Sequence, residues 1–228
     1  MIVAIDGPAA SGKSTAARGV AKALNITHID TGSMYRAVTY GLLKNQIEFN
    51  DLDAVEAYLS SVDLRFFKKN KITTLLLNGS DITENIRTND INKNVSEVSA
   101  LKIVREFMVN FQREMADDID CILEGRDIGT VVFPNADFKF FIIADDKARA
   151  YRRLEDLIEA GDKNPHEFES VLKELMLRDH KDSTRSYSPL KKANDAFEID
   201  TTHLTIDEVI NKIVNIVNQK KGHYINVK

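Results

Sequence analysis

The residues best suited to do chemistry lie near the start of the chain, in Gly7-Pro8-Ala9-Ala10-Ser11-Gly12-Lys13-Ser14 followed by Thr15. They satisfy Gly-x-x-x-x-Gly-Lys-Ser/Thr, a loop whose backbone N–H groups bind phosphates. Such a loop needs a strand before it and a helix after it, because phosphate sits at the positive end of the helix. Residues 2–5 are an apolar run typical of a buried strand, and residues 14–25 have a helical pattern. We therefore expect residues 7–15 to bind ATP, with Lys13 catalytic and the Ser14 hydroxyl a ligand of Mg²⁺.

Phosphoryl transfer depends mostly on positioning and on neutralising charge. A phosphorylated donor and a phosphorylated acceptor bring many negative charges together, so the site needs several cations. Arginine suits this role because its planar fork binds phosphate through two N–H groups and stays charged. The candidates are Lys13, Arg36, Arg105, Arg126, Arg153, Arg178 and Arg185. For any single arginine, a solvated surface role is the alternative.

Composition limits the classes of protein that the chain can belong to. With 228 residues and 43% hydrophobic residues, the chain has enough apolar sequence for one domain with a buried core. Its single cysteine, Cys121, permits no internal disulfide, and no apolar run approaches the roughly 20 residues that a transmembrane helix needs. The start of the chain has no basic segment followed by a signal-type apolar stretch. We therefore expect a cytoplasmic protein without membrane contact.

Strand and helix patterns alternate along most of the chain. Strands are predicted at 2–5, 26–30, 119–123, 138–143 and 196–199. Helical patterns lie between and after them, at 14–25, 34–44, 51–62, 90–115 with a break near 99–102, from 145 or 146, and from 205. Thr205 and Glu208 predict a capping box at the start of the last of these helices. This alternation predicts an α/β fold, a parallel sheet with helices on both faces. Ligands bind beyond the carboxyl ends of such strands, so we expect the polar clusters 7–14, 30–36 and 124–127 to converge there.

Two segments depart from the alternation. Residues 63–84 read as antiparallel strands at 64–67 and 72–77, joined by a polar turn at 68–71 and followed by Asn78-Gly79, and we interpret them as a small β insertion. Residues from about 154 to 190 are highly charged, contain Gly161 and Pro165, and include a helical pattern at 166–181. This second segment is suited to a short helical lid over the phosphates, with an ordinary surface helical hairpin as the alternative.

Several classes are disfavoured by what the sequence lacks. It has no Asn/Thr-Lys-x-Asp motif for reading guanine, its five histidines and Cys121 form no zinc pattern, and no basic stripe with interleaved aromatics suits nucleic acid. The net charge of −4 also argues against a protein that binds nucleic acid non-specifically.

Four segments in order closely resemble the bacterial cytidylate kinase family, the (d)CMP kinases of the nucleoside monophosphate kinase group. They are residues 7–14, Asp30-Thr31-Gly32-Ser33-Met34-Tyr35-Arg36, Gly125-Arg126-Asp127-Ile128-Gly129-Thr130-Val131-Val132, and Arg178-Asp179-x-x-Asp182-x-x-Arg185. The resemblance covers essentially the whole chain, including the β insertion and Ser188-Pro189. One departure is Glu124, where the family commonly has Asp, and the extra methylene puts in doubt any role of this carboxylate near Mg²⁺.

The resemblance implies one kinase domain over residues 1–228, acting as a monomer with ATP, CMP or dCMP, and Mg²⁺. By position, Thr31, Arg36 and Arg126 match contacts to the acceptor phosphate, while Ser96, Arg105 and Asp127 match residues that read cytosine. Arg178, Asp182 and Arg185 match residues that handle sugar and phosphates, and Arg153 resembles a lid-side arginine near the donor. The resemblance thus implies two sets of residues. The catalytic set is Lys13, Arg126, Arg153, Arg178 and Arg185, and the acceptor-binding set is Thr31, Tyr35, Arg36, Ser96, Arg105, Gly125, Arg126, Asp127, Arg178, Asp182 and Arg185.

The function expected on this basis is in-line transfer of the ATP γ-phosphoryl group to CMP or dCMP, without a covalent enzyme intermediate. Two alternatives stay open. One is a kinase for another monophosphate or a small metabolite, and the other is a P-loop protein that uses nucleotide binding as a switch.

Overall fold

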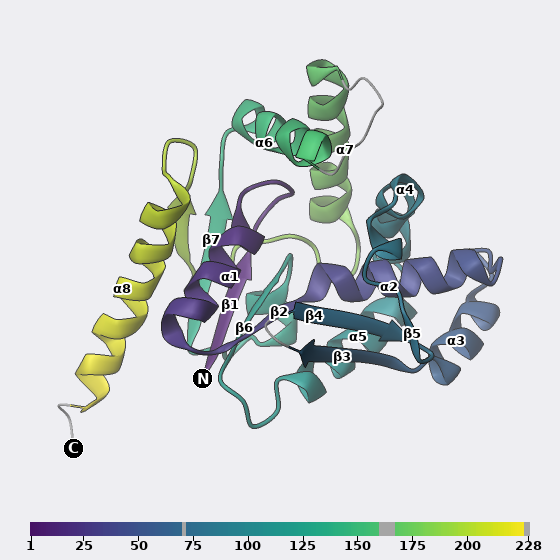
Figure 1. The fold of residues 1–228 in the computed structure, drawn as a ribbon, viewed down its shortest axis with the longest axis horizontal. Helices are drawn as coiled ribbons and strands as arrows, with labels where there is room; N and C mark the ends of the chain where they lie inside the picture. The colour runs from purple at the N-terminus through teal and green to yellow at the C-terminus, as the bar shows by residue number, and fades with distance from the viewer. Residues whose placement is uncertain (70–71, 160–166, 226–228) are drawn as a thin grey trace. The chain divides into compact units, whose positions relative to one another are not determined.

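The computed structural model describes residues 1–69, 72–159 and 167–225. These residues form two compact units, one of residues 1–30 and 115–228 and the other of residues 31–114. The first unit contains a five-stranded parallel sheet and the second a three-stranded antiparallel sheet. Helices flank the parallel sheet (Figure 1), so the predicted fold class is confirmed. Among the described residues, no helix has both the length and the apolar character needed to cross a bilayer.

The parallel sheet has the order β2-β6-β1-β7-β8. Its strands are β1 (Ile2–Asp6), β2 (Thr27–Asp30), β6 (Cys121–Gly125), β7 (Phe138–Ile143) and β8 (Phe197–Asp200). In register, Asp6 pairs with Gly125, and Asp30 pairs with Glu124. The carboxyl ends of β1, β2 and β6 therefore lie at one edge, where the sequence predicts polar residues.

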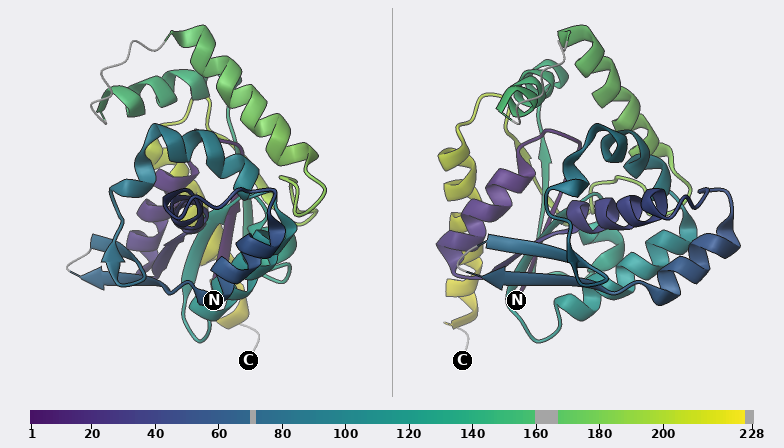
Figure 2. Two further views of the ribbon diagram at one scale, coloured as in Figure 1. Left: turned by 90° about the vertical axis from the view of Figure 1, so that its right-hand side faces the viewer. Right: turned by 45° about the vertical axis from the view of Figure 1, so that its right-hand side comes forward.

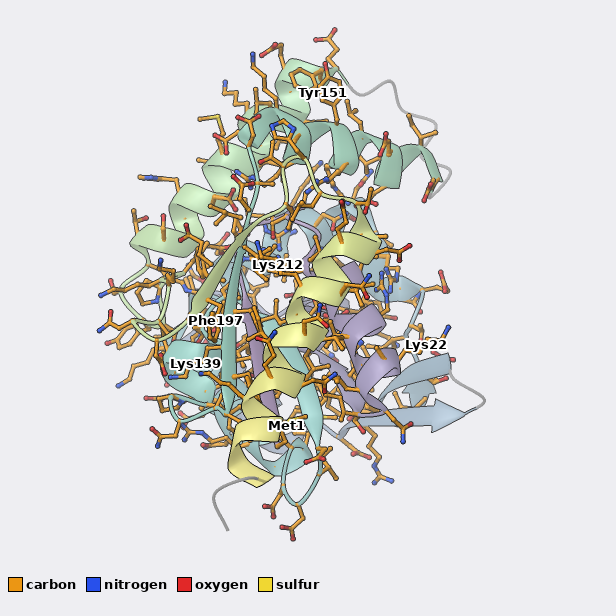
Figure 3. All side chains as sticks on the ribbon, turned by 90° about the vertical axis from the view of Figure 1, so that its left-hand side faces the viewer. Met1, Lys22, Lys139, Tyr151, Phe197 and Lys212 are labelled. Carbon is orange, nitrogen blue, oxygen red and sulfur yellow. The ribbon has the colours of Figure 1, made fainter. Side chains whose placement is uncertain are left out.

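Two helices cover one face of this sheet. α1 (Lys13–Leu24) and α8 (Ile206–Ile225) lie side by side, and Figure 3 shows α8 in front of the sheet with Lys212 on its exposed outer side. Alanines at one face of α1 allow close packing against the strands. The buried cluster includes Val3, Ile5, Ala16, Ala17, Val20, Ile122, Phe140, Ile142, Val209, Ile213 and Val217.

The remaining elements of the first unit lie along the chain after β6. They are a π-helical turn, η2 (Ile128–Val132), and the helices α6 (Asp146–Glu159) and α7 (Phe168–Thr184), which pack against each other (Figure 2). The segment predicted as a lid, from about 154 to 190, contains the end of α6 and all of α7. Its residues 160–166, with Gly161, Pro165 and the predicted helix start at 166, lie outside the described residues. The predicted capping box of α8 is confirmed, because the Thr205 and Glu208 side chains each accept from the other's backbone N–H.

The second unit combines helices with the small sheet. Its elements are α2 (Thr31–Lys44), α3 (Leu52–Ser61), β3 (Leu64–Lys69), β4 (Ile72–Leu77), β5 (Ser80–Asp81), η1 (Asn85–Arg87), α4 (Asn89–Val98) and α5 (Lys102–Met115). The predicted break near 99–102 is confirmed. Asn78 and Gly79 join β4 to β5 with φ values of 50° and 78°, the left-handed pair that favours Asn-Gly in tight hairpins.

Two predicted boundaries in this unit were wrong. α2 begins at Thr31, three residues before the predicted start at Met34. The first turn of a helix makes no use of its own N–H groups, so weak helix formers such as Thr31 and Gly32 are tolerated there. β3 continues to Lys69, because its backbone pairing with β4 extends through Lys69 and Ile72. Residues 70 and 71 of the predicted turn lie outside the described residues.

Candidate active site

Two glycines allow the path of the P-loop between β1 and α1. A Cβ atom at Gly7 would lie 2.1 Å from the carbonyl oxygen of Ile142, so no larger residue fits. Gly12 is the N-cap of α1 and has a φ of 86°, in the left-handed region that glycine adopts without strain. The hydroxyl of Ser11 is buried in the loop and has no hydrogen-bond partner among the residues that the structure describes. A polar group left in this way is suited to a polar ligand at the positive end of α1.

Lys13 is buried at the first position of α1, and its Nζ donates to the carbonyl oxygen of Pro8 at 2.8 Å. Burial lowers the pKa of Lys13 to about 7, with the charges of Arg126 and Arg178 adding to the effect. The carboxylates of Glu124 and Asp179 oppose this lowering. The loop thus holds a desolvated ammonium group that an anionic phosphate would stabilise.

Glu124 joins β6 to both β2 and α1. Its Oε2 accepts a hydrogen bond from the hydroxyl of Ser14, and its Oε1 lies 3.0 Å from Nε2 of His28. Glu124 is 3% exposed, so this carboxylate is almost fully removed from water. A hydroxyl and a carboxylate oxygen side by side fit Mg²⁺, which prefers oxygen ligands and is commonly held by one or two protein groups. Although Glu124 has one methylene more than the Asp that the family commonly has, its carboxylate still contacts the Ser14 hydroxyl.

Asp6, at the end of β1, holds the segment that follows β6. Its two carboxylate oxygens accept from the backbone N–H groups of Ile128 and Gly129, each at 2.8 Å. Burial raises the pKa of Asp6 to about 7, although these two hydrogen bonds act in the opposite direction. The strand that leads into the P-loop thereby also fixes the backbone directly after Arg126 and Asp127.

A buried carboxylate on α7 organises two of the predicted arginines. Asp182 accepts from Nε of Arg126 at 2.9 Å, and its Oδ1 lies 3.8 Å from Nη1 of Arg185. Arg185 also lies 3.8 Å from the buried Asp127. Burial acts to raise the pKa of Asp182, but Arg126, Arg178 and Arg185 outweigh it and hold that pKa below its usual value. These charges form one connected cluster.

The helices α6 and α7 together hold one residue of the P-loop, Ala9, at its N–H and at its carbonyl group. Asp179 accepts from the N–H of Ala9 at 3.0 Å, while Arg149 donates to the carbonyl oxygen of the same residue at 2.9 Å and pairs with Asp179. Arg152 donates to both oxygens of Thr201, and the Thr201 hydroxyl donates to the carbonyl oxygen of Ser11. The P-loop is therefore fixed at Ala9 and at Ser11 by residues distant in sequence.

In the second unit, α2 presents two candidate residues to neighbouring helices. Arg36 donates to Oδ1 of Asn92 on α4 at 2.6 Å and to the carbonyl oxygen of Ile86 at 3.3 Å. The guanidinium of Arg105 on α5 lies 4.8 Å from the ring centre of Tyr35, a cation–π contact. Arg105 is 3% exposed, so the packing of this unit defines its position.

The structure brings many of the predicted residues together within each unit. In the first unit, Asp182 contacts Arg126 and Arg185, and Arg185 lies near Asp127. In the second, Tyr35 contacts Arg105, while the buried Thr31 begins α2 and Ser96 lies on α4. Arg153 lies on α6, where its charge acts on Asp156.

Several polar residues beside the P-loop escaped prediction, namely Asp6, His28, Arg149, Arg152, Asp179 and Thr201 as structural partners. Asp6 and His28 carried a usable signal, because each is a polar residue in a short apolar strand. Arg149 and Arg152 had none, since their helix is polar on several sides.

The P-loop holds a buried lysine at the carboxyl edge of a parallel sheet, and carboxylates position arginines in the same unit. These features define the class of P-loop phosphotransferases. The model of the family described as cytidylate kinase matches residues 3–219. The chain belongs to this family.

Similarity to curated proteins extends over nearly the whole chain. It is 48% identical over 221 residues to the cytidylate kinase of Fusobacterium nucleatum subsp. nucleatum, covering 97% of this chain and 99% of that protein. It is 44% identical over 220 residues to the cytidylate kinase of Halalkalibacterium halodurans, covering 96% and 98%. A solved gluconokinase from Sinorhizobium meliloti 1021 is similar in fold, with a TM-score of 0.51 at 11% identity, covering 99% of this chain and 97% of that one.

Proposed function

We propose that the protein transfers the γ-phosphoryl group of ATP to CMP or dCMP, producing ADP and CDP or dCDP. The observation that carries this proposal is the complete P-loop around buried Lys13, in a chain that belongs to the cytidylate kinase family from residue 3 to residue 219. The match covers the whole second unit and nearly all of the first. We therefore propose that residues 1–228 act as one kinase domain.

The ATP phosphates bind the backbone N–H groups of residues 7–15, with the ammonium group of Lys13 against the β- and γ-phosphates. The Ser14 hydroxyl, hydrogen-bonded to Glu124, is the protein ligand for Mg²⁺. Mg²⁺ held there would neutralise part of the negative charge of the nucleotide phosphates. Arg149 and Asp179 bind the carbonyl oxygen and the N–H of Ala9, which keeps the loop in its conformation.

Arg126, Arg178 and Arg185 stabilise the charge that spreads over the transferring group, and Arg153 serves the donor side from α6. Transfer is in line and direct, so no protein side chain carries the phosphoryl group. Asp182 supports this role because it pairs with Arg126 and lies near Arg185. Fixing a guanidinium before the reaction reduces the reorganisation required in the transition state.

The contacts to the acceptor are those that the family resemblance implies for its phosphate, sugar and base. Thr31, Arg36 and Arg126 contact its phosphate, and Ser96, Arg105 and Asp127 read the cytosine. Asp182, Arg178 and Arg185 act at the sugar and phosphate. Tyr35 supports Arg105 through the ring contact, and the backbone of Gly125 adjoins Arg126.

The α6–α7 pair forms part of a lid over residues 154–190 that excludes water during transfer. Support comes from the contacts of Arg149 and Asp179 with the Ala9 peptide, which couple both helices to the P-loop. We also propose a cytoplasmic monomer that binds neither nucleic acid nor membranes. Light scattering after size-exclusion chromatography tests its mass.

A coupled assay of ADP release tests this function. The purified protein is given ATP and Mg²⁺ with CMP, dCMP, UMP, AMP or GMP in turn. We expect CMP or dCMP to give the highest kcat/KM. A higher value for another monophosphate would favour a different kinase, and slow hydrolysis indifferent to every acceptor would favour a nucleotide switch.

A further inference from the structure

His28 is a polar residue of β2 on the face of the sheet that α1 covers. In the parallel pair of β2 with β6, His28 lies opposite Ile122, and Glu124 is two residues further along β6. Side chains two apart on a strand share a face. Ile122 belongs to the core beneath α1, so His28 and Glu124 lie on that same face, where Ser14 is the second residue of the helix.

The carboxylate of Glu124 needs partners because it is 3% exposed. His28 Nε2 lies 3.0 Å from Oε1, while the Ser14 hydroxyl donates to Oε2. A carboxylate only accepts, so Nε2 is the ring nitrogen that carries hydrogen. Each of these contacts engages a different oxygen, and together they define the rotation of the carboxylate about its last bond.

We propose that His28 is a positioning residue of the nucleotide site. By holding Oε1, it keeps Oε2 directed at Ser14 and so orients the hydroxyl that binds Mg²⁺ with the nucleotide. This proposal rests on the proposed function only in that Ser14 is the Mg²⁺ ligand. Partners that orient a metal ligand from behind change metal affinity about 10–100-fold when removed.

The test measures binding of ADP by titration calorimetry, once with Mg²⁺ and once with a chelator, and takes the ratio of the two dissociation constants. His28→Phe keeps a planar ring but loses the hydrogen bond, whereas His28→Gln keeps an N–H donor. We expect His28→Phe to reduce the Mg²⁺-dependent gain in ADP affinity about tenfold. His28→Gln should recover most of that loss, and ADP affinity in the chelator should stay unchanged.

Thr27→Val is the matched control, because Thr27 precedes His28 on β2 and its side chain faces the other side of the sheet. It should leave the Mg²⁺-dependent gain unchanged. A purely structural role for His28 would lower the melting temperature of His28→Phe with no change in the ratio, and that result would overturn the proposal. Equal losses in His28→Phe and His28→Gln would overturn it too.

A second variant tests whether His28 acts through Glu124. In a Glu124→Gln background, where the carboxylate is gone, His28→Phe should change the ratio less than about twofold, since coupled residues are not additive. A full tenfold further loss would contradict action through Glu124. Because ADP binding needs no acceptor, these outcomes stand even if CMP is not phosphorylated. If the ADP affinity of the wild-type protein did not depend on Mg²⁺, the inference would be refuted.

Discussion

The two units hold their candidate arginines in different ways. In the first unit, Arg126 and Arg185 are tied to buried carboxylates of Asp182 and Asp127. In the second, Arg36 donates to an amide and a carbonyl group, and Arg105 lies over the ring of Tyr35. Carboxylate partners fix the geometry of an arginine and offset part of its charge, whereas an amide, a carbonyl oxygen or an aromatic ring orients the guanidinium without a full opposite charge. The contacts of Arg36 and Arg105 include such neutral groups, so the two pairs of arginines differ in part of what orients them.

The largest effect should come from Lys13→Met in the first unit. Loss of the cation at the transferring phosphate should reduce kcat about 10³-fold or more, comparable with removal of other charge stabilisers. The fold should persist, because methionine suits the buried site. Stopped turnover with an unchanged melting temperature is the expected result, and more than a tenth of wild-type kcat would remove Lys13 from this role.

Asp6 should make folding stability depend on pH. Its pKa is raised to about 7 in the folded protein, against 3.8 as the ordinary value. The folded state then binds the proton of Asp6 more tightly than the unfolded state does. The contribution of Asp6 to the free energy of unfolding is therefore greatest below pH 4 and is lost as pH rises towards 7. The upper limit of this change is about 4 kcal/mol.

Denaturant unfolding of wild type and Asp6→Asn at several pH values checks the assignment. Between pH 4 and 7 the free energy of unfolding of the wild type should fall relative to that of Asp6→Asn. Above pH 8 the difference between the two free energies should no longer change with pH. A difference independent of pH would show that Asp6 titrates normally.

Asp182→Ala tests the first unit, because it removes the carboxylate that accepts from Arg126 and lies near Arg185. Charge-assisted hydrogen bonds contribute about 1.5–3 kcal/mol, so kcat/KM should fall about 10–100-fold. The ratio between CMP and dCMP should also change if Asp182 contacts the sugar. Asn92→Ala, which removes the amide that accepts from Arg36 in the second unit, is the counterpart and should raise the KM for CMP more than it lowers kcat. Unchanged kinetics for Asp182→Ala on both substrates would exclude Asp182 from the site.

The smallest effect concerns the choice of base. Cytosine has an amino donor where uracil has a carbonyl acceptor, and an ionised carboxylate accepts only. Asp127→Asn should therefore lower kcat/KM for CMP more than for UMP and shrink their ratio about tenfold. Arg105→Ala should lower both together. If Asp127→Asn reduced the two substrates equally, Asp127 would only hold Arg185 in place.

Local patterns explain what could be predicted from the sequence. The P-loop, the strands and the capping box of α8 are defined by residues close together in the chain, so their spacing was sufficient. The partners of the P-loop were not predictable in this way, since His28 and Glu124 are 96 residues apart and Arg149 is 140 residues from Ala9. Helix packing and strand register bring such residues together, and neither can be derived from residue spacing alone.

The central claim is direct transfer from ATP to a cytidine monophosphate, and following the label tests it most directly. The purified protein is incubated with ATP labelled in its γ-phosphate, Mg²⁺ and CMP, and the labelled products are separated. The account predicts that label appears in CDP at the rate at which ADP forms, and that little label is released when CMP is absent. Label released as inorganic phosphate at the same rate with and without CMP would contradict it.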